Sequence, residues 1–170
     1  MPRPDLKKVP EWFHRYINQV EGTDIKLAMK GQTPAFIRFL KKIPHEKREY
    51  RYAKGKWTIK ELLQHIIDAE RIFGYRALRF ARNDKTELPG FEENDYADRA
   101  DANKRSIQEL LTELLIVRQS TLTLFRSFSE EQLKQKGIAN KNQVSVRAIG
   151  FIVIGHQNHH QNIFRERYLN

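Results

Sequence analysis

The spacing of the apolar residues constrains the fold of this chain more than any other feature of the sequence. They recur at steps of three and four residues, and the clearest run comprises Ile107, Leu110, Leu111, Leu114, Leu115, Leu122 and Phe125. Such steps bring side chains to one face of an α-helix, whereas a half-buried strand needs alternation with a period of two. Few stretches alternate in that way, so we predict an all-α protein.

Four long amphipathic helices are expected, over about residues 24–42, 59–82, 107–125 and 144–168. Thr58 and Glu61 have the spacing of a capping box at the start of the second helix. Pro34 lies inside the first helix, where we expect a kink or a break with Thr33 as a local N-cap. Long amphipathic helices with modest connections pack as a four-helix bundle.

The remaining segments are expected to surround one domain, because a chain of 170 residues is long enough for a single core. Residues 1–22 are predicted to form an N-terminal arm with a short helical piece that starts at Pro10 and is closed by Gly22. Residues 23–170 are predicted to form the bundle. Residues 83–99 are expected to be a long loop, a kind of segment that often carries function.

The composition excludes several kinds of site. The chain has no cysteine, so a metal site must use His, Asp or Glu. No apolar run approaches the roughly 20 residues that span a bilayer, and the N-terminus lacks the apolar region of a signal peptide. We therefore expect a cytoplasmic protein that does not enter a membrane.

The net charge of +10 is uneven, since residues 1–60 carry 15 Lys and Arg against 6 Asp and Glu. A basic excess can attract a polyanion, or it can be a solvated face that keeps the protein soluble. The sequence shows no pattern of a known nucleic-acid module, so a nucleic-acid partner is not expected.

The stretch GHQNHHQNIF near the C-terminus contains three of the six histidines. On a helical projection His156 lies in the middle of the apolar stripe, and His160 lies one turn further on the same face. His159 lies at the edge of the stripe. Two inward imidazoles at this spacing either bind one metal ion or form hydrogen bonds with neighbouring helices, and the pattern leaves both possibilities open.

Two further polar residues lie on the predicted second helix. His65 is on the flank of its apolar face, which suits a residue that lines a cleft between helices and makes it a candidate third ligand. Glu70 lies near the centre of that face and needs a partner there. The partner is either an arginine from another helix or a ligand histidine that Glu70 orients. His14 and His45 lie in weakly patterned segments and are given no role.

Three segments together resemble the DinB/YfiT-like superfamily. They are GKWTIKELLQHIIDAERIFGYRALRFARND (residues 55–84), LPGFEENDY (88–96) and IGHQNHHQNIFRERYL (154–169). Each is a weak motif, but their order and spacing are specific. With the matching helix spacing, the resemblance covers the chain from about Ile25 to the end.

The resemblance implies a bundle of up-down-down-up type and a divalent metal ion, nickel or zinc, held by His65, His156 and His160. His159 would then be a bystander or a residue that supports the site. Many members are dimers, so a homodimer is expected. Three neutral imidazoles leave coordination positions open, as catalytic metal sites do.

Three functions are considered, of which the first two are activities that the resemblance implies. The first is a metal-dependent transferase that joins a low-molecular-weight thiol, such as bacillithiol, to an electrophile; without cysteine, the thiol must come from a co-substrate. The second is a metal-dependent hydrolase on the same site. Both act on a small-molecule substrate. The third is a bundle without enzymatic activity, which holds a structural metal or binds a polyanion through the basic N-terminal third.

Overall fold

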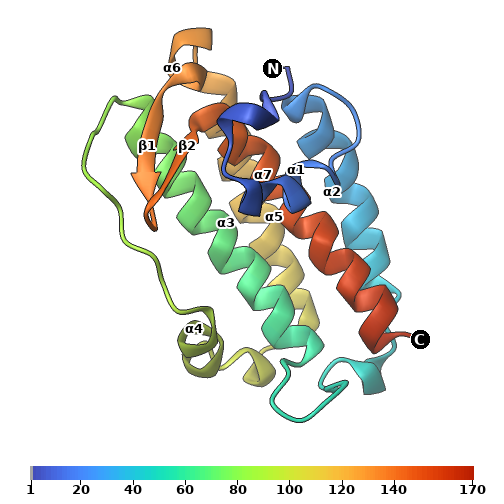
Figure 1. Cartoon of the computed structure of the whole chain (residues 1–170). Coiled ribbons are helices and arrows are strands. Elements are labelled where there is room, and N and C mark those ends of the chain that lie inside the picture. The colour runs from blue at the N-terminus through green and yellow to red at the C-terminus, as the bar shows by residue number, and fades with distance from the viewer. Residues whose placement is uncertain (1) are drawn as a thin grey trace.

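The computed structural model describes residues 2–170 and contains four long helices that stand side by side (Figure 1). They are α2 (Ile25–Lys41), α3 (Ile59–Ala81), α5 (Ile107–Ser127) and α7 (Val146–Ile163). Each begins within about two residues of its predicted start. The predicted all-α four-helix bundle is therefore confirmed.

Polar side chains fix where these helices begin. The Thr58 hydroxyl accepts a hydrogen bond from the Glu61 amide, and the Glu61 carboxylate accepts one from the Thr58 amide, as the sequence predicts. Ser106 and Glu109 form a second capping box at the start of α5. Ser145 caps α7. These bonds satisfy amides that have no partner inside the helix.

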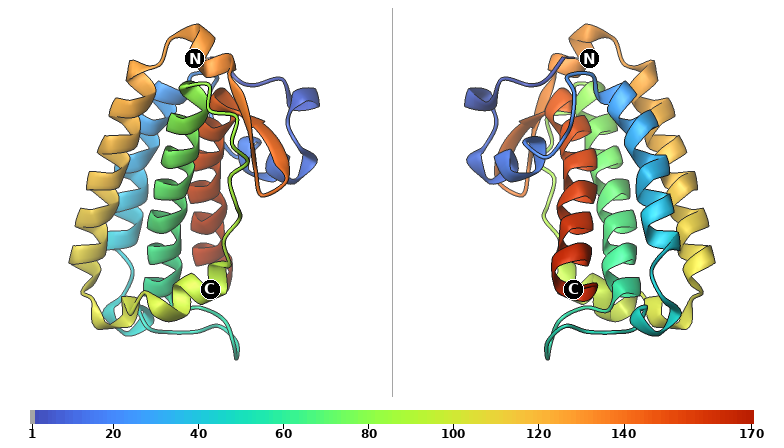
Figure 2. Two further views of the ribbon diagram at one scale, coloured as in Figure 1. Left: turned by 90° about the vertical axis from the view of Figure 1, so that its left-hand side faces the viewer. Right: turned by 90° about the vertical axis from the view of Figure 1, so that its right-hand side faces the viewer.

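Helices that are consecutive in the chain are not always adjacent in the bundle. In Figure 1, α2 and α7 run downward and α3 and α5 run upward, which is the arrangement that the resemblance implies. Helices α2 and α3 each pack against both α5 and α7, so the consecutive helices α2 and α3 lie on a diagonal (Figure 2). Because α3 and α5 are parallel, residues 82–106 must return along the length of the bundle.

The returning segment is not the continuous loop that the sequence predicts. Residues 93–99 form a short helix, α4 (Glu93–Arg99), and a 3-10 turn, η4 (Ala102–Lys104), follows. Acidic residues in the first turn of α4, Glu93 and Asp95, favour a helix N-terminus. Charge near the helix end therefore favours regular backbone in this segment, although the segment lacks a long apolar stripe.

Pro34 does not break α2. The helix is continuous, so Thr33 is not an N-cap; its hydroxyl donates to the carbonyl of Met29 at 2.7 Å. Met29 and Phe36 lie on either side of the proline and are both buried. Packing of the two halves against one core outweighs the hydrogen bond that proline removes.

A hairpin between α5 and α7 was not predicted. A short helix, α6 (Glu130–Lys134), leads into the antiparallel strands β1 (Lys136–Ala139) and β2 (Asn142–Ser145). Asn140 and Lys141 form the two-residue turn with φ of 49° and 63°. Positive φ at both positions is the hairpin conformation that Asn-Gly usually adopts. Lysine in place of glycine hides this signal in the sequence.

The N-terminal residues fold against α7. They contain η1 (Leu6–Lys8), η2 (Glu11–Phe13), which follows Pro10 as predicted, and α1 (His14–Ile17). Nε2 of His14 lies 3.0 and 2.9 Å from the carbonyls of Leu6 and Val9 and so holds the segment together. The division of the chain at residue 22 stays a prediction.

Two single turns complete the helical structure. A 3-10 turn, η3 (His45–Lys47), lies between α2 and α3. A π-helical turn, η5 (Phe164–Tyr168), continues α7 to the predicted end of the last helix. No helix in residues 2–170 combines the length and the hydrophobicity that crossing a bilayer requires.

Candidate metal centre

The core of the bundle has two apolar parts with polar side chains near their boundary. One part includes Ile25, Phe80, Phe125 and Phe151. The other includes Phe36, Leu63, Leu114 and Phe164. The buried polar residues near the boundary include Thr33, His65, Glu70, Arg118, His156, Gln157 and His160. Buried polar groups cost stability unless they find partners, so their partners indicate what each group does.

Glu70 and Arg118 satisfy each other. Nε and Nη2 of Arg118 donate to the two carboxylate oxygens of Glu70, each at 2.8 Å. Nη1 of Arg118 donates to Thr33 and Gln157, at 2.7 and 3.0 Å, so this one arginine joins all four long helices. The ion pair is one of the two alternatives for Glu70. A contact between Glu70 and a ligand histidine stays a prediction.

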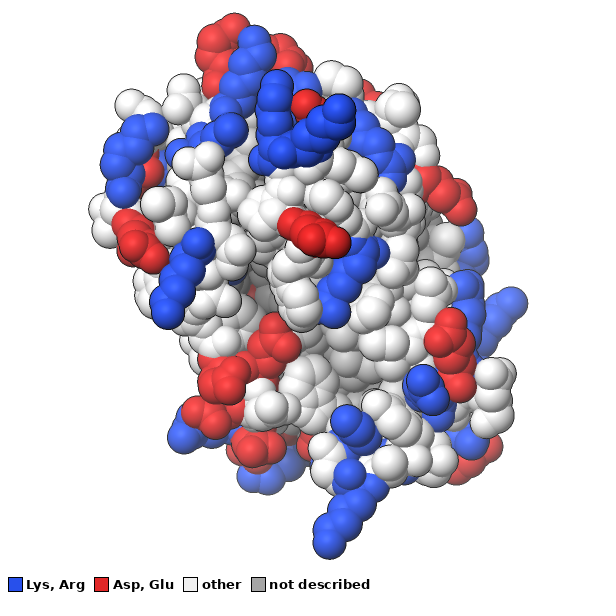
Figure 3. Space-filling view, in the orientation of Figure 1, with Lys and Arg blue, Asp and Glu red and all other residues white. Residues whose placement is uncertain are grey.

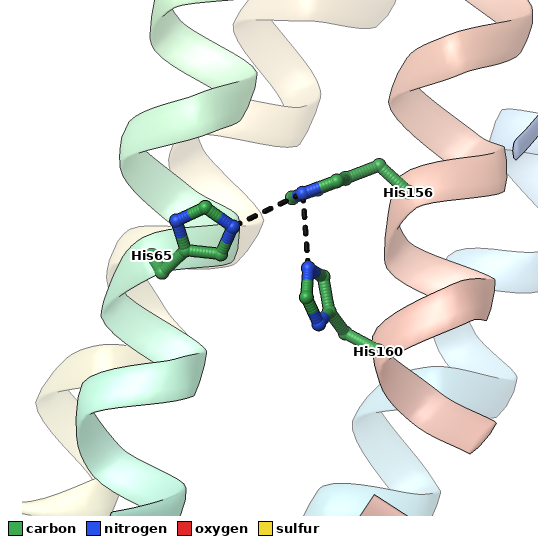
Figure 4. Close-up of side chains that lie close together, drawn as sticks. All are labelled: His65, His156 and His160. Atoms are coloured by element: carbon green, nitrogen blue, oxygen red, sulfur yellow. Dashed lines mark hydrogen bonds between the residues drawn. The ribbon is translucent and has the colours of Figure 1, made fainter. Parts of the chain in front are cut away.

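His65, His156 and His160 converge across the groove between α3 and α7 (Figure 4). Nε2 of His156 lies 3.1 Å from Nε2 of His65 and 3.0 Å from Nε2 of His160. The atoms that the three rings offer to a metal all lie within 4.8 Å of one another. His65 comes from α3 and the other two from α7, one turn apart.

Aromatic rings pack against two of these imidazoles, those of His65 and His156. The Trp57 ring lies 4.9 Å from the His65 ring. The rings of Tyr16 and Phe73 meet the His156 ring edge-on at 5.3 and 5.8 Å. The surroundings of the site are therefore apolar, which strengthens electrostatic interactions inside it.

The three imidazoles are neutral at pH 7. Burial lowers the pKa of His65 to about 4. Burial, followed by the neighbouring histidines, holds the pKa of His156 and of His160 well below the ordinary value. Neutral imidazole is the form that binds a metal ion.

The arrangement of nitrogen atoms fits a divalent transition ion. A neutral imidazole has one N–H donor and one acceptor nitrogen, yet Nε2 of His156 faces two other Nε2 atoms at hydrogen-bond distance. Nε2 of His156 carries either one proton or one lone pair, so it cannot form two good hydrogen bonds at once. An ion between the rings would accept all three lone pairs, and imidazole suits zinc, nickel, copper and iron.

Comparison with known proteins identifies the family. The sequence profile of the DinB superfamily matches residues 28–164. The chain belongs to the DinB superfamily. A relative from Oceanobacillus iheyensis, named as a candidate metal-dependent hydrolase, is 25% identical over 152 residues, which are 88% of this chain and 82% of the relative.

Solved structures share the DinB fold. YfiT from Bacillus subtilis, described as a probable metal-dependent hydrolase with an unusual four-helix bundle topology, has a TM-score of 0.70 and 16% identity over 96% of this chain and 89% of its own. The DinB-like YjoA of the same organism has a TM-score of 0.59 and 17% identity over 83% and 86%. The mycothiol-dependent maleylpyruvate isomerase has a TM-score of 0.64 and 11% identity over 88% and 59%.

His159 faces the N-terminal segment of this DinB chain, as expected for a residue at the edge of the stripe. Its Nδ1 lies 3.4 Å from the Gln19 amide nitrogen, and its ring meets the Tyr16 ring edge-on at 5.4 Å. His159 is also absent from the group of converging nitrogens. Its contacts are those of a residue that holds the N-terminal segment on α7.

Two cavities reach the histidine cluster, one at His156 and the other at His160. One, of about 100 Å³, is lined by His156 together with Tyr16 and Phe73. The other, of about 230 Å³, is lined by His160 together with Trp57.

The aromatic residues of the N-terminal segment were not singled out from the sequence, because they lie far from the histidines along the chain and no periodic pattern links the two.

Proposed function

We propose that this protein is a metal-dependent enzyme that holds one divalent ion, nickel or zinc, through His65, His156 and His160. The convergence of three buried, neutral Nε2 atoms from two helices carries this proposal. A divalent ion held there by three imidazoles keeps open coordination positions and lowers the pKa of a thiol or a water molecule that it binds.

The proposed reaction joins a low-molecular-weight thiol to an electrophilic carbon. The thiol sulfur forms the new S–C bond, the leaving group departs with the electrons of the bond that breaks, and the thiol proton passes to solvent. The chain has no cysteine, so the sulfur comes from a co-substrate such as bacillithiol. The two cavities beside His156 and His160 support this choice, because a transfer reaction needs room for two molecules.

Hydrolysis at the same site is the second candidate. The descriptions of the O. iheyensis relative and of YfiT favour it. A hydrolase would use water in place of the thiol, so the two reactions share the histidines and differ in their need for a thiol.

Monochlorobimane tests the two reactions, because thiol transfer to it releases chloride and gives a fluorescent product. We expect the metal-loaded protein to accelerate this reaction with at least one of bacillithiol, mycothiol and glutathione. His156→Ala should lower the rate by about 100-fold or more, whereas His45→Ala, on a distant turn, should not change it. Thiol-independent cleavage of a nitrophenyl ester would support hydrolysis, and no acceleration of either reaction would contradict the proposal.

A further inference from the structure

The cavity beside His156 is closed by three segments that lie far apart in the sequence. Helices α3 and α7 form its floor, and the N-terminal segment, the β1–β2 hairpin and residues 90–93 form its walls. The backbone of Leu88 bonds to Ile138 and Asn140, which fixes the wall at Pro89. Much of the lining is aromatic and includes Trp12, Phe13, Tyr16, Phe73 and Phe91. This aromatic part of the lining suits an apolar group.

The lining also contains the polar residues Glu93, Asn140, Asn142 and His156, and one buried cation. Arg76 lines the cavity, although only 8% of the residue is exposed. Its Nη2 donates to the Pro89 carbonyl at 2.9 Å. Within residues 2–170 this is its only side-chain hydrogen bond, and it has no ion pair. A guanidinium carries five N–H donors and a full charge, and burial without a counter-charge is costly.

The other charges nearby do not compensate Arg76. Glu93 also lines the cavity, but its side chain is exposed and its cationic neighbour is Arg15. Burial lowers the pKa of Arg76, and no carboxylate within residues 2–170 opposes it. By contrast, the buried Arg118 has both oxygens of Glu70.

The positions along α3 relate Arg76 to the histidine centre. His65, Ala69, Phe73 and Arg76 follow one another at steps of four, four and three residues, so they share one face of the helix. Eleven residues of α-helix span about 16 Å. Phe73, Arg76 and His156 all line the cavity, so it connects one histidine of the centre to a cationic group.

We propose that Arg76 binds an anionic group, such as a carboxylate, of the small molecule that reacts at the three-histidine centre. The inference rests on the proposed function for the reaction, but the binding itself does not require a metal. It assigns the substrate class: a small organic anion whose apolar part lies against the aromatic walls and whose reactive end reaches His156. Arg76 would be a specificity-determining residue of the site.

A matched pair of probes tests this inference on the metal-free protein. The probes are 3-phenylpropionate and its neutral amide, 3-phenylpropionamide, and binding is followed by NMR of the ¹⁵N-labelled full chain. We expect the anion to bind about tenfold tighter or more than the amide and to shift the Arg76 Nε–H signal. Equal affinities, or an Arg76 signal that does not move, would overturn the proposal.

Variants of Arg76 separate binding from structure. Arg76→Met should remove the preference for the anion, and Arg76→Gln, which keeps a donor for Pro89, should remove it as well. Arg82→Met, at an exposed arginine near the end of α3, should keep it. A preference that survives in a folded Arg76 variant would also overturn the proposal.

Metal uptake distinguishes this inference from the proposed function. Arg76→Met and Arg76→Gln should still take up zinc or nickel. Failure of the wild-type protein to take up metal would contradict the proposed function and leave the anion result unaffected.

Discussion

At the scale of single residues, buried polar groups in this bundle fall into two kinds. Arg118 and Glu70 have partners for their charges, with two hydrogen bonds of 2.8 Å between them. His156 instead has its Nε2 atom opposite the Nε2 atoms of His65 and His160. The first kind stabilises a particular packing of the helices. The second kind would be satisfied by a cation bound between the rings.

Removing one partner of the buried ion pair should be costly. Glu70→Leu leaves the Arg118 charge buried without a counter-charge, so we expect a loss of about 3 kcal/mol or more in the free energy of unfolding. Urea denaturation monitored by circular dichroism measures it. Asp95→Ala removes one partner of the exposed Asp95–Arg99 pair and should change stability by less than about 0.5 kcal/mol. Similar losses for the two variants would contradict this account of the pair.

The histidines should make the metal-free protein sensitive to acid. Because burial lowers the pKa of folded His65 to about 4, the unfolded chain binds more protons between about pH 6.5 and 4. The free energy of unfolding then falls as pH decreases through this range. At higher pH, His65 adds no pH dependence. The full effect of His65 is roughly 3 kcal/mol. His156 and His160 act in the same direction.

Urea denaturation of metal-free protein at pH 7 and pH 5 checks this prediction. The wild type should lose more stability between the two pH values than His65→Leu, which has no proton to gain at that position. Comparison of the two proteins removes the contribution of the carboxyl groups, which is common to both. An equal loss in both would show that His65 does not have a lowered pKa in the folded state.

At the scale of elements, one glycine permits the N-terminal segment to lie on α7. A methyl group at Gly155 would lie 2.0 Å from the backbone carbonyl oxygen of Tyr16. Tyr16 contacts His156 and lines the cavity beside it. The position of α1 therefore depends on the residue that directly precedes His156.

Gly155→Ala should displace α1 and destabilise the protein by about 1–3 kcal/mol, the usual cost of overpacking. Limited proteolysis should then cut the N-terminal segment faster than in the wild type. Gly31→Ala on α2 is the matched control, since nothing lies within 4 Å of the added methyl group and stability should rise by up to about 1 kcal/mol. Unchanged proteolysis in Gly155→Ala would contradict this role of the glycine.

The elements also show which parts of the structure the sequence could predict. The helices and the inward positions of His156 and His160 follow from periodicity and from caps such as Thr58 and Glu61, because these depend on neighbours within a few residues. Continuity through Pro34 depends on packing against other helices. The hairpin turn at Asn140 and Lys141 lacks its usual glycine. Neither the continuity of α2 nor the hairpin could be predicted from local patterns.

The candidate site was predictable only in part for the same reason. The helical projection of His65 indicated a flank position, and the resemblance grouped it with the histidines of the last helix. The partner of Glu70 and the cavity with Arg76 depend on contacts between distant segments. In particular, Arg76 contacts a loop that pairs with the hairpin, and no spacing in the sequence records that contact.

At the scale of the whole molecule, the bundle topology creates the site. Helices α3 and α7 are neighbours, although 91 residues separate His65 from His156. The returning segment, the hairpin and the N-terminal residues then cover the groove between them.

On the face shown in Figure 3, Lys and Arg gather toward the N-terminal end, and acidic residues gather near α4. The expected homodimer stays a prediction, which light scattering can test.

The metal content of the protein tests the central claim most directly. Untagged protein, purified without chelators, should contain close to one divalent transition ion per chain by elemental analysis. His156→Ala should lose the ion and keep its helical circular dichroism, whereas His159→Ala should retain the ion because its ring faces Gln19 and Tyr16. A folded wild-type protein that contains no such ion and takes up neither zinc nor nickel would contradict the account.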